Sequence, residues 1–283
     1  MNNKFNKVMD EFIDSFNRDS SQNQIFFPII DHKKYFLKVA GKNRSKYSEN
    51  EIKSLKKLQK ISPFYRNYYI DSKTKDEKTA ILLKYIEGED LSFLMSSKKM
   101  TLQSLIKLYK TLLRKIKIYH DRKLTHGDIK DKNFFSYINQ EGEINIELID
   151  TESVNDFSKR LREGEEYKNI ITRTYDFPFK IKRSKICFSS IENAFSFYRY
   201  VDLYCVSILI FYLYRQDVYK IVRNDKERSW DNKRPTDYLN NKNKLEKTLS
   251  YVFSFLPHLD ISALKKCEIP TIPLTANDIL KKL

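Results

Sequence analysis

Glycine and proline are scarce in this chain of 283 residues, which contains five glycines and seven prolines. Flexible linkers and repeat arrays are usually richer in both, and we predict neither here. Long apolar runs are also missing, since the longest, Val206 to Leu213, is far too short to cross a bilayer. The first residues, Met1 to Phe5, lack the apolar core of a secretory signal. We therefore expect a cytoplasmic protein without a transmembrane segment, and secretion as an effector stays open.

Cysteine is rare as well. Cys187, Cys205 and Cys267 are odd in number and lack the spacing of metal ligands. We therefore expect reduced thiols rather than a disulfide framework or a zinc site.

Apolar residues and positive charge are plentiful. Hydrophobic residues make up 41% and aromatic residues 14% of the chain, which is typical of a folded protein with a sizeable core. The formal net charge of +16 favours an acidic partner. The lysines are spread along the chain and no nucleic-acid motif stands out, so we expect no nucleic acid ligand. Residues 1–20 predict an amphipathic helix that packs on the fold, and peripheral contact with an anionic membrane is the minor alternative.

One polar stretch, Thr125 to Asn133, is followed by an apolar run, Ile144 to Ile149, that ends in Asp150. This pattern predicts a loop, then a strand that presents a carboxylate at its end. Asp128 is followed at +2 by Lys130 and at +5 by Asn133. Phosphoryl transfer needs a carboxylate for the attacking hydroxyl's proton, a cation for the moving phosphate and oxygen ligands for magnesium. A mere turn and a strand-end residue are the alternative interpretation.

The order His126, Asp128, Lys130, Asn133 and then Asp150 resembles the catalytic loop and metal aspartate of the protein kinase-like superfamily. The resemblance implies an α+β, bilobal protein kinase-like fold, with a small antiparallel-sheet lobe carrying one main helix and a larger helical lobe. We expect the small lobe in residues 1–85 and the large lobe in residues 86–283. It also implies ATP and Mg²⁺ as cofactors. Asp128 and Lys130 would then be catalytic, and Asn133 and Asp150 would hold the metal.

Further landmarks of that superfamily occur in the expected order. Lys38, in the strand-like run Tyr35 to Ala40, matches the lysine that binds the α- and β-phosphates. Glu51, in a helix predicted over residues 48–61, matches its glutamate partner, with Glu49 as the alternative. Ser48 and Glu51 also have the spacing of a helix capping box, and we favour the pairing role.

The adenine site is expected where the small lobe ends. After Pro63, strands are predicted over residues 65–71 and 79–84. By the resemblance, Leu83 guards the back of the nucleotide pocket, and Tyr85 and Ile86 belong to the hinge that binds adenine, with Gly88 in the turn that follows.

In the large lobe, residues 102–121 predict a long helix whose apolar stripe faces the core. The resemblance gives His120 and His126 structural roles. It implies that Asp202, which opens an apolar helix, ties down the catalytic-loop backbone. The segment 151–200 would bind the acceptor, and Glu192 lies near the family spacing from Asp202. Two stretches, Arg234 to Thr236 and Leu274 to Leu280, each echo the last-helix motif of the family.

Three departures from the family pattern stand out. No glycine occurs between Met1 and Gly41, so the glycine-rich loop over the phosphates is missing. The Asp-Phe-Gly motif has become Asp150-Thr151-Glu152, which keeps the metal aspartate and loses the glycine. Gly127 replaces an arginine that would meet a phosphorylated activation segment, so we expect activity without such phosphorylation.

The predicted function is transfer of the γ-phosphate of ATP to a hydroxyl, and a protein Ser/Thr acceptor is favoured. A kinase of a lipopolysaccharide-core sugar or another small molecule is the alternative, since Gly127 and Glu152 also look like those enzymes. A pseudokinase scaffold is the second alternative, supported by the missing glycines. A nucleic-acid-binding protein rests on charge alone and ranks last.

Overall fold

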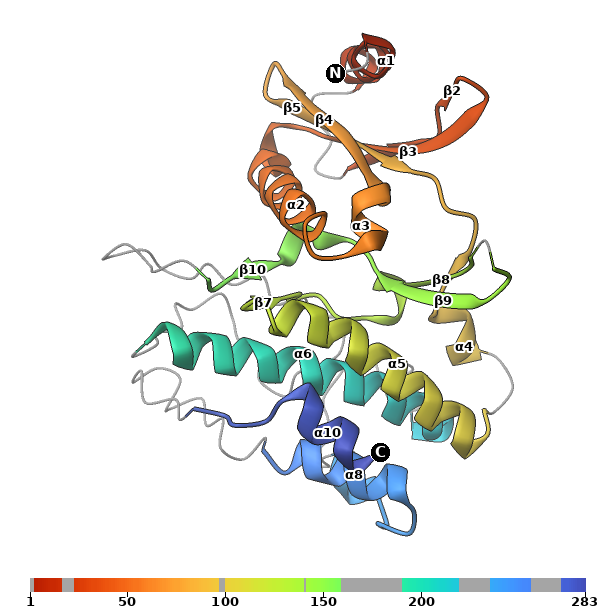
Figure 1. Cartoon of the computed structure of the whole chain (residues 1–283), viewed down its shortest axis with the longest axis vertical. Coiled ribbons are helices and arrows are strands. Elements are labelled where there is room, and N and C mark those ends of the chain that lie inside the picture. The colour runs from red at the N-terminus through yellow and green to blue at the C-terminus, as the bar shows by residue number, and fades with distance from the viewer. Residues whose placement is uncertain are drawn as a thin grey trace. The chain divides into compact units, whose positions relative to one another are not determined.

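The computed structural model describes residues 3–16, 23–96, 100–139, 141–158, 190–218, 235–255 and 271–283. The chain divides into two units. The first comprises Met1–Gly88 with Asp150–Val154, and the second comprises Glu89–Ile149 with Asn155–Leu283. Figure 1 labels most of their helices and strands.

An antiparallel sheet forms the basis of the first unit. Its strands run in the order β1-β3-β5-β4, and β2 also pairs with β3. The strands are β1 (Gln24–Phe26), β2 (Ile29–Ile30), β3 (Lys33–Ala40), β4 (Tyr69–Lys75) and β5 (Lys78–Lys84). Asp31 and His32 alone connect β2 to β3, with φ of 49° and 60°. Two positive φ values are what a two-residue hairpin turn of type I′ requires. The strand-like runs Ile25 to Ile30 and Tyr35 to Ala40 predict a hairpin that turns at residues 31–34, and the hairpin is present with a tighter turn.

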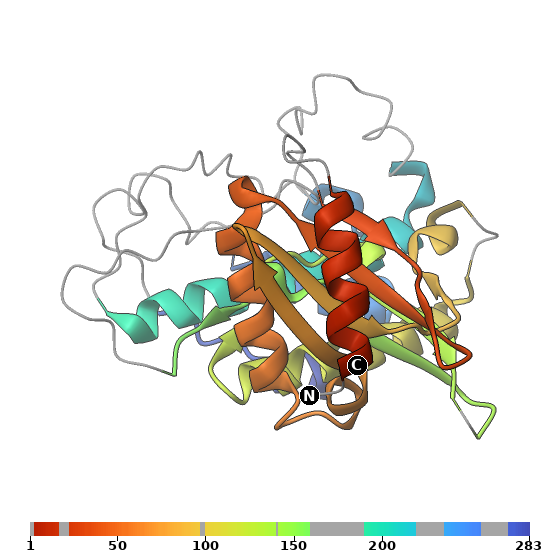
Figure 2. The same cartoon turned by 90° about the horizontal axis from the view of Figure 1, so that it is seen from above.

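Helix α1 (Asn3–Ser15) lies across one face of this sheet, as Figure 2 shows from above. Its residues Met9 and Ile13 join Phe16 in a buried cluster with residues of the strands, namely Ile30, Leu37, Val39, Ala80 and Leu82. The predicted packing role of the N-terminal helix is confirmed. Lys78, buried in β5, donates from Nζ to the carbonyl oxygens of Ile13 at 2.7 Å and Phe16 at 3.0 Å. These bonds satisfy carbonyl groups that the end of a helix leaves open.

Two helices connect β3 to β4, and both correct the sequence-based expectation. Helix α2 (Ser45–Leu58) follows the 3₁₀ turn Lys42–Arg44, so it begins three residues before the predicted start at Ser48. Ser48 is therefore inside the helix, which rules out the capping box that was the alternative to the favoured pairing of Glu51. Helix α3 (Pro63–Tyr68) replaces the first part of the strand predicted from residue 65. Pro63 fits the first turn of a helix, where its missing N–H has no partner to lose.

The second unit consists mainly of helices. They are α4 (Ser92–Ser96), α5 (Leu102–His120), α6 (Ile191–Tyr214), α8 (Lys244–Phe253) and α10 (Ala276–Lys282). Its short strands are β6 (Glu89–Asp90), β7 (Leu124–Thr125), β8 (Phe134–Ile138), β9 (Ile144–Leu148) and β10 (Asn155–Asp156), paired as β6-β8-β9 and β10-β7. The 3₁₀ turns are Asp131–Asn133 and Pro235–Tyr238 here and Thr151–Ser153 in the first unit.

Helix α5 buries the predicted stripe, which contains Leu105, Leu108, Leu112, Leu113 and Ile116. Thr101 caps its N-terminus by accepting a hydrogen bond from the Ser104 amide. A capping box between Thr275 and Asp278 caps the N-terminus of α10. In the first of the two stretches that echo the last-helix motif, Arg234 lies outside the described residues. So do Cys267 and residues 159–189, which contain Cys187 and most of the segment expected to bind the acceptor.

Helix α6 is apolar on all sides and contacts α5 and α8. Within the described residues it is the helix long and apolar enough to cross a membrane, and 94% of its most apolar window is buried in the protein. That burial is what a core helix of a folded domain shows. The helix begins at Ile191, with Ser190 as its N-cap, so Asp202 is in its middle and does not open it as predicted.

Candidate active site

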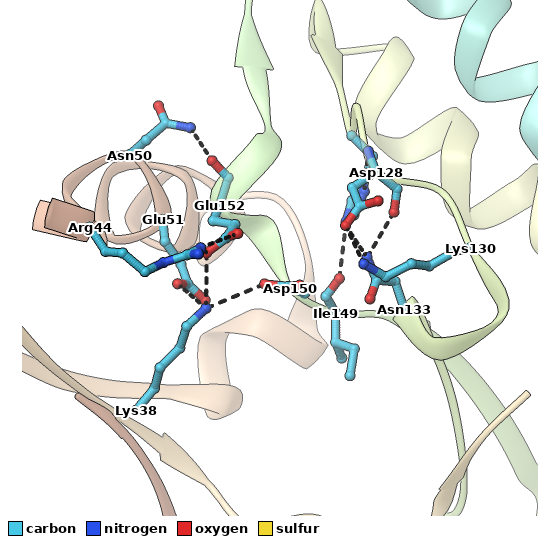
Figure 3. Close-up of polar contacts among 11 residues, drawn as sticks. Lys38, Arg44, Asn50, Glu51, Asp128, Lys130, Asn133, Ile149, Asp150 and Glu152 are labelled. Carbon is cyan, nitrogen blue, oxygen red and sulfur yellow. Dashed lines mark hydrogen bonds and ion pairs between the residues drawn. The ribbon is translucent and has the colours of Figure 1, made fainter. Parts of the chain in front are cut away.

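Lys38 of β3 is surrounded by carboxylates in the first unit (Figure 3). Its Nζ lies 2.7 Å from Glu51 Oε2, 3.4 Å from Asp150 Oδ1 and 3.3 Å from Glu152 Oε2. Lys38 and Glu51 are 8% and 3% exposed. The structure thus pairs Lys38 with Glu51, the favoured partner, whereas Glu49 is on the exposed side of α2.

Burial and charge act in opposite directions on this lysine. Burial lowers the pKa of Lys38, but the charges of Glu51, Asp150 and Glu152 outweigh it, so the pKa lies above its usual range. Burial raises the pKa of Glu51, and Lys38 only partly offsets this effect. Lys38 therefore keeps its positive charge at neutral pH, as a phosphate-binding group must.

The face of the sheet that carries Lys38 is apolar beside it. Directly paired residues of neighbouring strands point to the same face. Ile25 pairs with Lys38, and Leu83 pairs with Phe36, two residues before Lys38. Ile25 and Phe27, which alternate along one edge of this face, are each 51% exposed. Neither residue was predicted as part of the site, although residues that alternate along a strand point to the same face.

The predicted adenine-site residues lie at and after the end of β5. Leu83 is buried, and Tyr85 and Ile86 are half-buried. The ring of Tyr85 packs edge-on against Phe27 with centroids 5.9 Å apart, and Lys34 Nζ lies 4.1 Å from its centroid. Apolar and aromatic side chains, with the positive charge of Lys34, thus lie beside the residues predicted to bind adenine.

The second unit brings Asp128, Lys130 and Asn133 together (Figure 3). Lys130 Nζ donates to Asp128 Oδ2 at 2.6 Å. Asn133 Nδ2 donates to the same oxygen at 3.0 Å and to the carbonyl oxygen of Asp128 at 2.8 Å. Asp128 is 4% exposed. Because both bonds use the amide nitrogen of Asn133, its amide oxygen is the atom suited to a metal.

Asp202 holds the backbone of this loop. Its Oδ2 accepts from the His126 amide at 2.7 Å and its Oδ1 from the Gly127 amide at 3.0 Å. His120 Nε2 lies 3.2 Å from Oδ2, and His126 Nε2 lies 3.0 Å from the carbonyl oxygen of Ile149. Gly127 has φ of 77°, a value that disfavours other residues. The loop is thus braced by groups that sequence spacing alone does not bring together.

Asp150 directly follows Ile149 and has the left-handed backbone of φ 60°, ψ 71°. Ligand oxygens of Asp150, Glu51 and Glu152 lie within 4.8 Å of one another in the first unit. Asn133 belongs to the second unit. Carboxylate and amide oxygens are the donors that Mg²⁺ prefers, so the predicted metal ligands fit that ion by chemistry.

Glu192 is exposed in the first turn of α6, and its Oε2 lies 2.8 Å from Lys123 Nζ. The structure thus places this landmark on the surface of the second unit, in an ion pair.

Comparison with known proteins agrees with these landmarks. A family model described as the protein kinase domain matches residues 28–262. Among curated proteins, none matches the chain. The family match includes both the strand with Lys38 and the loop with Asp128, and it spans most of the 283 residues. The chain therefore belongs to the protein kinase domain family, has its bilobal α+β fold and is a kinase.

Proposed function

We propose that this kinase transfers the γ-phosphate of ATP to the hydroxyl of protein Ser or Thr residues, with magnesium as the metal. The observation that carries the proposal is the buried Asp128 carboxylate, whose Oδ2 is held by Lys130 and Asn133. A buried carboxylate with two fixed donors has one orientation, and positioning supplies much of the rate in phosphoryl transfer.

Asp128 would orient the acceptor hydroxyl and take its proton at the carboxylate. Lys130 would place its positive charge where negative charge develops on the transferred group. Lys38, fixed by Glu51, would hold the α- and β-phosphates. Leu83, Tyr85 and Ile86 would bind the adenine, and the apolar face with Ile25 and Phe27 would cover the base. Asn133 and Asp150 would hold Mg²⁺, which neutralises phosphate charge when bound.

A small-molecule acceptor, such as a lipopolysaccharide-core sugar, is the second candidate. Three observations favour it: Gly127 in the loop, Glu152 two residues after Asp150, and the two-residue turn Asp31–His32 where the family has a glycine-rich loop. The net charge of +16 also suits a phosphorylated glycolipid. A pseudokinase scaffold would keep nucleotide binding without transfer. Residence in the cytoplasm is part of the proposal.

The test is transfer of label from γ-labelled ATP and Mg²⁺ by wild type, Asp128→Ala and Asp121→Ala. Asp121 is an exposed aspartate of the same unit, paired with Lys117, and serves as the matched control. Loss of a general base costs about 100-fold to 10,000-fold in turnover, so Asp128→Ala should fall by at least about 100-fold. Asp121→Ala should keep wild-type activity.

The fraction that carries the label decides the acceptor. Label on protein supports the Ser/Thr proposal, and label on a sugar or lipid fraction supports the second candidate. Full activity of Asp128→Ala would overturn the assigned base. ATP binding without any transfer by wild type, whatever acceptor is supplied, would indicate the pseudokinase.

A further inference from the structure

The segment after Asp150 is fastened to the helix that carries Glu51. Arg44, at the N-cap position of α2, contacts Glu152 from its Nη2, at 2.7 Å to Oε1 and 2.9 Å to Oε2. Asn50 Nδ2 donates to the backbone carbonyl oxygens of Glu152 at 2.8 Å and Val154 at 3.0 Å. Side chains from the start of α2 therefore hold both the side chain and the backbone of this segment (Figure 3).

The fastened segment begins with a strained residue. Asp150 has φ of 60°, and a left-handed conformation costs a non-glycine residue about 1 kcal/mol. Such a conformation persists only where the surroundings determine it. On its N-terminal side, Ile149 donates its amide to the Asn133 carbonyl at 2.8 Å. On its C-terminal side, the contacts of Glu152 with Arg44 and Asn50 fix the backbone that follows Asp150.

Glu152 also affects the charge around Lys38. Lys38 alone would face the three carboxylates of Glu51, Asp150 and Glu152, all within 3.4 Å of its Nζ. Arg44 brings a second positive charge to Glu152, and its side chain is 26% exposed, so solvent screens this pair only in part. With Arg44 present, Glu152 is shared between two cations. Without the Arg44 side chain, Lys38 would pair with all three carboxylates unaided and would be drawn toward Glu152.

We propose that Arg44 and Glu152 form a positioning pair that keeps Asp150 and Lys38 in the geometry needed for phosphoryl transfer. This inference rests on the proposed function of Lys38 and Asp150. Glu152 stands where the family has a glycine, so the pair replaces freedom of movement by an ion pair within the first unit. The Arg44–Glu152 pair thus holds Asp150, the predicted metal ligand, without phosphorylation of the chain.

A double-mutant cycle tests the pair with Arg44→Ala, Glu152→Ala and both together. We expect each single variant to lower kcat about tenfold, with a smaller change in KM for the acceptor. The double variant should lose no more than about tenfold, because the second change removes a partner already lost. Arg44→Lys should recover part of the activity, since it keeps the charge and loses the fork of donors.

The exposed pair Lys42 and Glu77, 2.8 Å apart in the same unit, provides the matched control cycle. Its variants should keep wild-type kcat. Additive losses in the Arg44 and Glu152 cycle, or unchanged kcat in the single variants of an active wild type, would overturn the inference and leave the proposed function standing.

A wild type that transfers no label would overturn the proposed function instead. In that case the affinity of each variant of the cycle for MgATP is measured by calorimetry. Non-additive affinities would support the positioning pair, and additive or unchanged affinities would overturn it. Absence of nucleotide binding by wild type would overturn both.

Discussion

Single buried carboxylates determine much of the geometry of the catalytic loop. Asp202 is 1% exposed and accepts two backbone amides, so its charge is solvated by the loop that it holds. Asp202→Ala would leave these amides and His120 without that acceptor. We expect a loss of about 3 to 5 kcal/mol in the free energy of unfolding, measured in urea. Asp121→Ala should change it by less than about 0.5 kcal/mol, and an equal loss in both variants would contradict the bracing role.

Glu51 sets an expected pH dependence. Its pKa lies above the ordinary value of 4.5, because burial raises it more than Lys38 lowers it. The charged form pairs with Lys38, so kcat/KM should fall as pH decreases through this raised pKa, and the fall should begin above pH 4.5. The free energy of unfolding should rise as pH falls through the same range. The reason is that the folded state, in which the pKa of Glu51 is raised, takes up this proton more readily than the unfolded state. A pH profile checks the first effect.

Glu51→Gln is the matching variant for that profile. It should have low activity at every pH and lack the acid limb that Glu51 causes. A wild-type limb that persists unchanged in Glu51→Gln would assign the limb to another group.

The residues of the site differ in how far they could be predicted. Asp128, Lys130 and Asn133 lie within six residues, so their spacing already implied a shared loop. The contact of Arg44 with Glu152 joins residues 108 positions apart, and no local pattern points to it. The roles of the site residues stay predictions, and so does the lobe boundary at residues 85 and 86.

At the scale of helices and strands, α1 depends on one lysine of β5. Lys78→Met keeps the apolar stem and removes the donor to the carbonyls of Ile13 and Phe16. We expect a loss of about 1 to 3 kcal/mol in the free energy of unfolding, because buried acceptors lose a charged donor. Lys75→Met is the control, since its partner Asp14 is exposed, and should cost much less than Lys78→Met. Equal costs would show that Lys78 does not cap α1.

The errors in the predicted elements have local physical causes. Residues 65–68 contain aromatic residues that favour strands, yet Pro63 starts a helix there and tertiary packing overrides the propensity. Ser48 looked like a cap because a glutamate follows at +3, while the helix already begins at Ser45. Long amphipathic patterns, such as α5, were predictable since their period extends over many residues.

For the whole molecule, the net charge of +16 predicts a salt effect on acceptor choice. Raising the salt concentration from about 0.05 M to 0.3 M shortens the range of electrostatic attraction. We expect kcat/KM for an acidic protein acceptor to fall several-fold, with kcat nearly unchanged, because steering acts on encounter. A basic acceptor of similar size is the control and should not lose activity. Equal salt dependence for the two acceptors would show that the net charge does not determine acceptor choice.

Helix α6 has a consequence for synthesis on the ribosome. Its apolar surface is covered partly by α8, which follows it in the chain. Residues 215–283 are still to be made when α6 is complete, which takes roughly 3 to 14 s at about 5 to 20 residues per second. During that interval a 24-residue apolar helix lacks its later partners. The nascent chain should therefore bind chaperones at this point, and chains that stop before residue 244 should aggregate.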